Sequence, residues 1–274
     1  DPAEVRLTNL IQPNQFPYTT PTGGIYDAGN YPKVFNQVLN LSNYSNLRKL
    51  QIKKRKEGKF FGIGIGLAID PSASNMGYVT VAIPSEIRES PNYNPKSGNL
   101  STASVKVDIS GKVVAEVDTN PQGQGHETVV AQIVANELGI KPEDISVNSN
   151  FDSFTKVWSI ASGSYSSVFA TMGASSVTFA ARKVKDKILK IAAHLLEARI
   201  EDLKLENNNV FVLGSPDKLI SFKRIAGTAH WNPTLLPDDI DPGLQARHTF
   251  SMKVLKPPDK YDRVNSSATY GFIA

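Results

Sequence analysis

The stretch SVKVDISGKVVAEVDTNPQGQGHETVVAQIVANELG, residues 104–139, decides the fold because the spacing of its apolar residues changes part-way along. In its first half they alternate with polar residues on both sides of a Ser-Gly pair, which predicts a β-hairpin. From about Glu127 to Leu138 they recur at helical spacing, and Gly139 stands where a helix end favours a left-handed residue. A hairpin followed at once by a helix indicates an α+β fold.

Four residues join this hairpin to this helix: Gln122, Gly123, Gln124 and Gly125. The first N–H groups of a helix have no partner within the helix, and the helix dipole favours negative charge near them. The two glycines let a ligand approach the backbone without meeting a Cβ, and the glutamine amides both donate and accept hydrogen bonds. The turn therefore predicts a site for an anion or for the polar edge of a heterocycle.

A second helix start has the same character. Residues 162–167 are Ser-Gly-Ser-Tyr-Ser-Ser, and the apolar residues after them keep helical spacing, which predicts one long helix near 164–197. Two polar, glycine-containing helix starts favour one ligand held between them. Two ordinary helix caps are the alternative, because serine and glycine are common at such positions, and the residues alone leave both open.

The remaining segments follow from the same spacing rules. The first thirty residues are expected to be irregular, and residues 31–57 to be helical with a break near 42–45. The run FFGIGIGLAID, residues 60–70, alternates aliphatic residues with glycine or alanine, which predicts a strand whose glycine face is covered by protein. A short strand at EDISVN, a hairpin through residues 207–209 and a final strand at SATYGFIA complete the prediction.

Composition excludes several classes of function. The chain has 274 residues, enough for one large domain or two modest ones, and it has no cysteine. Without cysteine it can form no disulfide, thiolate metal site or iron–sulfur cluster of its own. No apolar run approaches the ~20 residues of a membrane span, and the N-terminus lacks the pattern of a signal peptide. We therefore expect a cytoplasmic protein with no membrane span.

Charge and motifs narrow the classes further. The net charge is only +4, and the basic run KKRKEGK, residues 53–59, favours a solvated helix end over a nucleic-acid patch. The four histidines show no metal-ligand spacing, and neither a GxSxG motif nor a phosphate-binding lysine loop is present. No catalytic residue and no metal ligand is therefore expected in this chain.

The two helix starts carry a resemblance to a known family. PQGQGHETVVAQIVANELGI followed by SGSYSSVFATMGASSVTFAARKVKDKILKIAAHLLEA resembles the molybdenum-binding large subunit of the xanthine oxidase family, in the aldehyde and carbon monoxide dehydrogenase branch. DPAEVRLTNLI, FPYTTPTGGIYDAGNYPKVF, GIGIGLAIDPSASNMGY, DIDPGLQARHTF and ATYGFIA are similar to further segments of that branch, in the same order. The resemblance therefore extends along the whole chain.

This resemblance implies the α+β fold of a molybdenum-cofactor-binding domain and a molybdenum–molybdopterin cofactor, in its plain form or as the cytosine dinucleotide. In the family the Gln-Gly-Gln-Gly turn contacts the cofactor near the oxo group of the metal, and the second helix start binds its dithiolene and phosphate side. Carried over to this sequence, the cofactor-binding residues are Gln122, Gly123, Gln124, Gly125, His126, Thr128, Gly163, Ser164, Ser166 and Ser167. Tyr165 departs from the arginine often seen in the carbon monoxide branch, which weakens the assignment of CO as substrate.

The resemblance also implies how the chain is divided and that it is part of a longer subunit. Residues 1–58 are expected to form an irregular and helical N-terminal segment, and residues 59–274 a truncated cofactor-binding region, within an internal fragment of a longer large subunit. The complete family enzyme oxidises an aldehyde or CO with water-derived oxygen, and its base glutamate lies outside this stretch.

FAD is expected on a medium partner subunit and 2Fe–2S clusters on a small one, in a homo-oligomeric complex. The chain alone, as a split-gene product or a trimmed piece, is expected to be inactive. The alternative is a non-catalytic ligand-binding or assembly module with the same fold.

Overall fold

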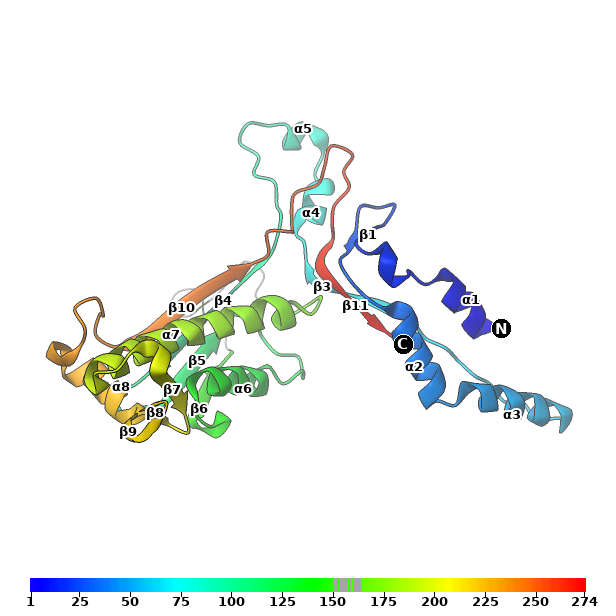
Figure 1. Cartoon of the computed structure of the whole chain (residues 1–274). Helices are drawn as coiled ribbons and strands as arrows, with labels where there is room; N and C mark the ends of the chain where they lie inside the picture. Colours follow the sequence, from blue (N-terminus) through cyan, green and yellow to red (C-terminus); the bar gives the residue numbers. More distant parts are fainter. Residues whose placement is uncertain (150–151, 153–156, 158, 160–163) are drawn as a thin grey trace. The chain divides into compact units, whose positions relative to one another are not determined.

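The chain forms two compact units in the computed structural model (Figure 1). The residues described are 1–149, 152, 157, 159 and 164–274. One unit, Asn99–Met252, is called the central unit below; the other, the terminal unit, combines Asp1–Gly98 with Lys253–Ala274. Both mix helices with small sheets, which confirms the predicted α+β class. The predicted division after residue 58 stays a prediction.

The central unit is built on a four-stranded sheet with the order β10-β4-β5-β6. Its strands are β4 Leu100–Val107, β5 Val113–Val117, β6 Ile145–Asn148 and β10 Leu244–Ser251. β4 and β5 form the predicted hairpin, and β10 runs antiparallel along β4. β5 and β6 are parallel, and parallel neighbours need a crossover connection, which helix α6, His126–Leu138, supplies. The turn before α6 therefore lies beyond the carboxyl end of β5.

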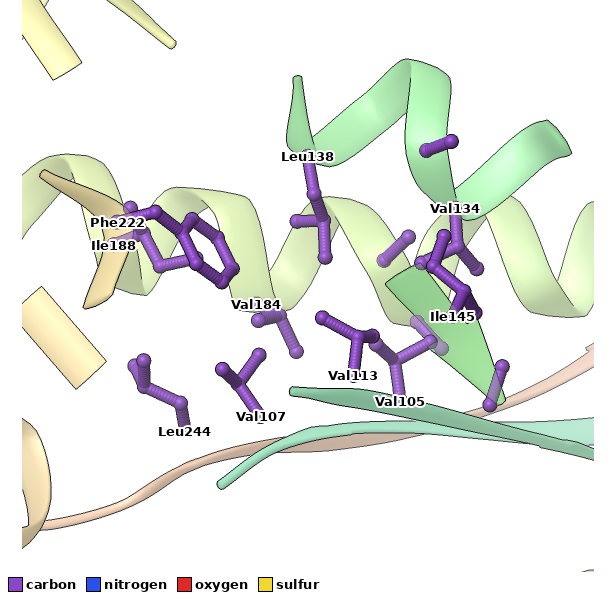
Figure 2. Close-up of a cluster of buried hydrophobic side chains, with 14 of the residues drawn as sticks. Val105, Val107, Val113, Val134, Leu138, Ile145, Val184, Ile188, Phe222 and Leu244 are labelled. Atoms are coloured by element: carbon purple, nitrogen blue, oxygen red, sulfur yellow. The ribbon is translucent and has the colours of Figure 1, made fainter. Parts of the chain in front are cut away.

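Helices α6 and α7, Ala174–Leu196, pack against this sheet and form the core with it. α7 follows one π-helical turn, Phe169–Gly173, so the long helix predicted near 164–197 is confirmed. Along β4 every second residue faces the core, and along α6 and α7 the core-facing residues recur every three or four positions, as the periods of a strand and a helix require. The core residues labelled in Figure 2 are Val105, Val107, Val113, Val134, Leu138, Ile145, Val184, Ile188, Phe222 and Leu244.

A second, antiparallel sheet with the order β7-β8-β9 completes the central unit. The remaining elements are β7 Leu203–Glu206, β8 Asn209–Val212, β9 Ser215–Ser221, α8 Phe222–Trp231 and the short 3₁₀ turns Pro142–Asp144, Ile200–Asp202 and Pro233–Leu235. The hairpin predicted through residues 207–209 is confirmed, with left-handed Asn207 and Asn208 in its turn. The spacing rules did not predict β9, α8 or β10.

The terminal unit holds two two-stranded sheets and several short helices. Its elements are α1 Pro2–Asn9, the 3₁₀ turn Pro13–Gln15, β1 Tyr18–Thr19, β2 Ile25–Tyr26, α2 Tyr31–Leu41, α3 Tyr44–Lys56, β3 Ala68–Ser74, α4 Gly77–Val81, α5 Ser85–Arg88 and β11 Ser267–Ile273. β11, the predicted final strand, pairs antiparallel with β3. No helix in the described part of the chain is both long enough and apolar enough to cross a bilayer.

Asn75 is the polar centre of the terminal unit and is fully buried. Its side-chain oxygen accepts hydrogen bonds from the backbone N–H groups of Gly77 and Gly98, both at 2.8 Å. Its side-chain nitrogen donates to the carbonyl oxygens of Lys256, at 2.8 Å, and Asn265, at 2.9 Å. The amide thus uses its full bonding capacity to join segments far apart in the sequence.

The helices near the N-terminus confirm one prediction and correct another. The expectation of an irregular first thirty residues is wrong for α1, because Asp1 accepts a hydrogen bond from the backbone N–H of Ala3, at 2.7 Å, and Glu4 completes a capping box. The break predicted near 42–45 is confirmed, since α2 ends at Leu41 and α3 begins at Tyr44.

The glycine-rich run differs from its prediction. Regular strand pairing begins only at Ala68, so the strand predicted for residues 60–70 is wrong for its first part. Gly62, Gly64 and Gly66 are exposed, and a Cβ built on any of them meets no atom within 4 Å. The protein cover predicted for their face is not supplied by the described residues of this chain.

Candidate functional site

The first part of the site is the end of β5, where the chain leaves the sheet. Asp118 follows β5 directly and is only 2% exposed. Its carboxylate accepts hydrogen bonds from Ser101 Oγ, at 2.5 Å, and from the backbone N–H of Thr102, at 2.7 Å. Burial raises the pKa of Asp118, and these hydrogen bonds oppose the rise. The carboxylate fixes the starting point of the turn that follows.

That turn, residues 122–125, has a backbone that only glycine adopts easily. Gly123 has φ 101° and Gly125 has φ 73°, both in the left-handed region. A Cβ built on either glycine meets nothing within 4 Å, so the space beside the turn is open. Gln122 and Gln124 are exposed, and the backbone N–H of Gln122 donates to Gln124 Oε1. The turn can therefore admit a ligand close to its main chain.

Helix α6 begins directly after the turn, with Gly125 as its N-cap and no side chain capping it. Glu127 lies in the first helical turn and accepts a hydrogen bond from Ser149 Oγ at 2.7 Å, which lowers the pKa of Glu127. This contact ties the start of α6 to the residue after β6. Thr128 is exposed beside it. The helix start thus offers backbone N–H groups that no capping side chain covers.

The second predicted helix start is strained. Ser166 has φ 46° and Ser167 has φ 45°, so two consecutive serines adopt the left-handed conformation. This conformation costs roughly 1–2 kcal/mol for each non-glycine residue, and such strain gathers at functional sites. Hydrogen bonds from Val168 N to Tyr165 O and from Ala170 N to Ser167 O, both 3.0 Å, hold the turn. Gly163, predicted to belong to this start, lies outside the described residues.

The two helix starts meet at His126. Its ring stacks on Phe169, with 3.9 Å between centroids and 16° between planes, and its Nε2 lies 3.5 Å from Ser164 Oγ. His126 is 3% exposed, and burial lowers its pKa, while the Thr119 backbone and the Glu127 charge oppose the shift. The ring is therefore neutral near pH 7 and acts as a packed bridge between the two starts.

Two site residues escaped the sequence analysis. Phe169 lies among the apolar residues of the long helix, and nothing in the sequence distinguishes it as the partner of His126. Asp118 could have been found from the sequence, because it is a carboxylate placed directly after an alternating strand. Ser101 is a second signal, since it is a polar residue at an inward position of β4. Paired polar residues at inward positions indicate a buried hydrogen-bonded group.

The residues brought together can bind a polar group but show no catalytic set. Among the described residues, no three His, Asp or Glu side chains gather as metal ligands. Residues 122–128 and 164–167 contain no lysine or arginine, so an anion here would be held by backbone N–H groups, amides and hydroxyls. Open space beside left-handed glycines fits a large, polar, anionic cofactor.

Comparison with protein families assigns the chain to a family. The family described as the molybdopterin cofactor-binding domain matches residues 37–274, most of the chain and both helix starts. The chain belongs to this family. The predicted resemblance is confirmed, and the open turn at α6 and the strained start before α7 lie within the matched region of this molybdopterin cofactor-binding chain.

Individual relatives agree with the family. The chain is 34% identical over 253 residues to the carbon monoxide dehydrogenase large chain of Afipia carboxidovorans, covering 90% of this chain and 29% of that one. It is 30% identical to the nicotine 6-hydroxylase large subunit of Paenarthrobacter nicotinovorans, covering 89% of this chain and 28% of that subunit.

A solved structure of reconstituted CO dehydrogenase from Oligotropha carboxidovorans matches 99% of this molybdopterin-binding chain with a TM-score of 0.75 and 32% identity, over 31% of its own length. The chain therefore spans less than a third of the length of these relatives.

Proposed function

We propose that this chain is the cofactor-holding part of the large subunit of a molybdenum hydroxylase, which oxidises an aldehyde or CO with oxygen derived from water. The observation that carries the proposal is the meeting of the two glycine- and serine-containing helix starts, where His126 contacts both Ser164 and Phe169. Family membership and a relative named as a carbon monoxide dehydrogenase large chain support the chemistry.

In this proposal the residues of the chain bind and orient the cofactor. The N–H groups at Gly123, Gly125 and the first turn of α6 donate to its negatively charged and carbonyl oxygens, and the Gln122 and Gln124 amides bond its polar edge. The hydroxyls of Ser164, Ser166 and Ser167 donate from the second start. Each hydrogen bond to a charged group contributes about 1.5–3 kcal/mol, so several are needed for tight binding. The molybdenum of the bound cofactor supplies the two-electron redox chemistry.

The proposal includes the rest of the large subunit and its partner subunits, because the chain is shorter than its relatives. The rest of the large subunit completes the pocket and contributes the acid–base group, and the cofactor is molybdopterin or its cytosine dinucleotide. With no cysteine, this chain cannot ligate an iron–sulfur cluster, so the 2Fe–2S clusters lie on a small partner subunit and FAD on a medium one. The complex is cytoplasmic and homo-oligomeric in this proposal.

The experiment compares two glycines that share a left-handed backbone conformation, one inside the candidate site and one outside it. Gly125 and Gly214 have φ 73° and 81°, and a Cβ on either meets nothing within 4 Å. Gly125→Val and Gly214→Val are introduced into the intact complex, and molybdenum and pterin are measured per subunit. We expect Gly125→Val to lose most of the cofactor and Gly214→Val, in the β8–β9 turn, to retain it. Full cofactor content in a folded Gly125→Val complex would contradict the proposal, and a wild-type complex without cofactor would favour the non-catalytic module.

A further inference from the structure

A side chain, that of Asp118, takes the place of the backbone where the ladder between β4 and β5 ends. Val117 opposite Ala103 is the last pair of the ladder, and the backbone N–H of Asp118 still donates to the carbonyl oxygen of Thr102 at 3.2 Å. In a hydrogen-bonded antiparallel pair, the N–H of Thr102 would donate in return to the carbonyl oxygen of residue 118. It donates instead to Asp118 Oδ2, at 2.7 Å. The carboxylate therefore completes the pair, and the main chain of β5 can turn away into residues 119–125.

The carboxylate lies among buried polar side chains from two other segments. Ser101 Oγ of β4 donates to Asp118 Oδ1 at 2.5 Å. Burial raises the pKa of Asp118, and the hydroxyl of Ser159 is among the groups that oppose the rise, so Ser159 lies close enough to act on the carboxylate. Ser101 is 1% exposed and Ser159 is 5% exposed. A buried carboxylate is costly unless such groups surround it, so both serines help to fix its position. Asp118, Ser101 and Ser159 are called the Asp118 cluster below.

Each of the two helix starts follows a member of the Asp118 cluster closely in the sequence. Asp118 precedes Gln122 by four residues, and Ser159 precedes Ser164 by five. Even when fully extended, these two connections span only roughly 14 Å and 18 Å. His126, whose Nε2 lies 3.5 Å from Ser164 Oγ, joins the same two starts beyond the first turn. The helix starts are therefore connected at two places, through His126 and through the Asp118 cluster.

We propose that Asp118 is a positioning residue that holds both helix starts at the separation that the cofactor requires. Its two oxygens fix the end of β5 against β4, and its contact with the Ser159 hydroxyl fixes the segment that enters the second start. The left-handed Ser166 and Ser167 need such an anchor, because strained residues relax unless the surrounding structure holds them. This inference rests on the proposed function, because it takes the cofactor as the ligand of the two starts.

Hydrogen–deuterium exchange at the two helix starts tests the inference. The intact complex is made in cells that cannot synthesise the pterin, so that bound cofactor does not mask the effect. Asp118→Ala should speed exchange at least about 10-fold in peptides covering residues 122–130 and also in those covering 164–172, relative to peptides from the middle of α7. Ser159→Ala should speed exchange in residues 164–172 only. Faster exchange in residues 122–130 alone after Asp118→Ala, or unchanged exchange in residues 164–172 after Ser159→Ala, would overturn the inference.

Asp108→Ala is the matched control, because Asp108 is also an aspartate that holds a turn of the same hairpin. Its Oδ1 accepts hydrogen bonds from Ser110 Oγ, at 2.7 Å, and from the backbone N–H groups of Ser110, at 2.8 Å, and Lys112, at 3.0 Å. It stands at the other end of β4 and β5, so its loss should leave exchange at both helix starts unchanged. Faster exchange at both starts in this variant would show that any weakening of the hairpin loosens them, and would contradict a special role for Asp118.

The variant Asp118→Asn distinguishes hydrogen bonding from charge. Its side-chain oxygen still accepts from the N–H of Thr102, and its NH₂ group can donate to Ser101, because a serine hydroxyl accepts as well as donates. We therefore expect Asp118→Asn to restore wild-type exchange at both helix starts. Exchange as fast as in Asp118→Ala would contradict a positioning role that rests on hydrogen bonds.

The cofactor content of the same variants, made in cells that synthesise the pterin, keeps this inference distinct from the proposed function. We expect Asp118→Ala to contain less molybdenum and pterin per subunit than Asp108→Ala, because fewer of its molecules present both helix starts in the binding conformation. Equal content in the two variants would overturn the inference alone. The expected exchange pattern in a complex whose wild type never carries molybdenum or pterin would refute the proposed function and leave Asp118 as the anchor of both starts.

Discussion

The substitution Gly139→Ala tests how α6, which carries the candidate site at its start, is anchored at its other end. Gly139 caps α6 with φ 61°, and its carbonyl oxygen accepts a hydrogen bond from the backbone N–H of Asn208 at 3.0 Å. A Cβ at this position would lie 2.6 Å from the carbonyl oxygen of Leu205 and 2.8 Å from Glu206 Cα. Both are backbone atoms of β7, so the new methyl group cannot be accommodated by a side-chain rotation.

The magnitude follows from two contributions. The left-handed conformation costs an alanine roughly 1–2 kcal/mol, and forcing a methyl group into a filled space costs about 1–3 kcal/mol more. Gly139→Ala should therefore lower the free energy of unfolding by about 2–5 kcal/mol. Gly214→Ala is the matched control, because Gly214 has φ 81° with nothing within 4 Å of its Cβ, and it should cost only about 1–2 kcal/mol.

Urea unfolding followed by tryptophan fluorescence measures this difference. Trp231, the last residue of α8, belongs to the central unit, so its signal reports the unit that contains both glycines. We expect Gly139→Ala to lose at least about 1 kcal/mol more than Gly214→Ala. Equal losses would refute the claim that the β7–β8 hairpin is packed against the end of α6.

Three further predictions concern buried polar groups. Burial lowers the pKa of His126, so the stability that the neutral ring contributes is fully present above the unfolded pKa of about 6.5 and is lost as pH falls through the lowered folded pKa. His126→Phe should therefore remove this loss of stability from urea titrations between about pH 7 and 5. The same pH profile in the variant and the wild type would contradict this prediction. Asp118→Ala leaves the Ser101 hydroxyl and the Thr102 backbone N–H without their acceptor and should cost about 2–4 kcal/mol by tryptophan-monitored unfolding, against about 1 kcal/mol for Ser101→Ala; similar costs for both would show that Asp118 does not organise the β5 end. Asn75→Ala should speed hydrogen exchange in residues 75–98 and 253–266 by at least about 30-fold, a loss of roughly 2 kcal/mol, and unchanged exchange there would show that these segments do not depend on Asn75.

Periodicity predicted the elements that place the candidate site. The alternation along β4 and β5, the helical spacing of α6 and the left-handed Gly139 are all local patterns, and the structure has each of them. The capping box at Asp1 and Glu4 was equally local, and α1 was missed only because the prolines and glycines that follow it dominate that region. β10 was missed although its residues alternate, with Leu244, Ala246 and Phe250 less exposed than the polar residues between them; what no local pattern specifies is its partner β4, which lies far away in the sequence.

The candidate site was predictable in its parts and not in its assembly. Gly123 and Gly125 stand at a strand-to-helix junction, which is sufficient to predict an anion-binding turn. The stacking of His126 on Phe169 depends on how α6 and α7 pack, and no spacing rule specifies which aromatic residue a histidine meets. The run with Gly62 was misjudged for a related reason, since an alternating pattern predicts an extended chain but not whether a neighbouring strand is present.

The most direct test of the central claim is an experimental structure of the intact, cofactor-loaded large subunit. The account predicts that density for the molybdopterin lies between residues 122–125 and 164–167, with backbone N–H groups of the first turn of α6 and hydroxyls of the second helix start at about 2.7–3.2 Å from its oxygens. Cofactor density elsewhere in the subunit, with both helix starts covered by protein side chains, would contradict it.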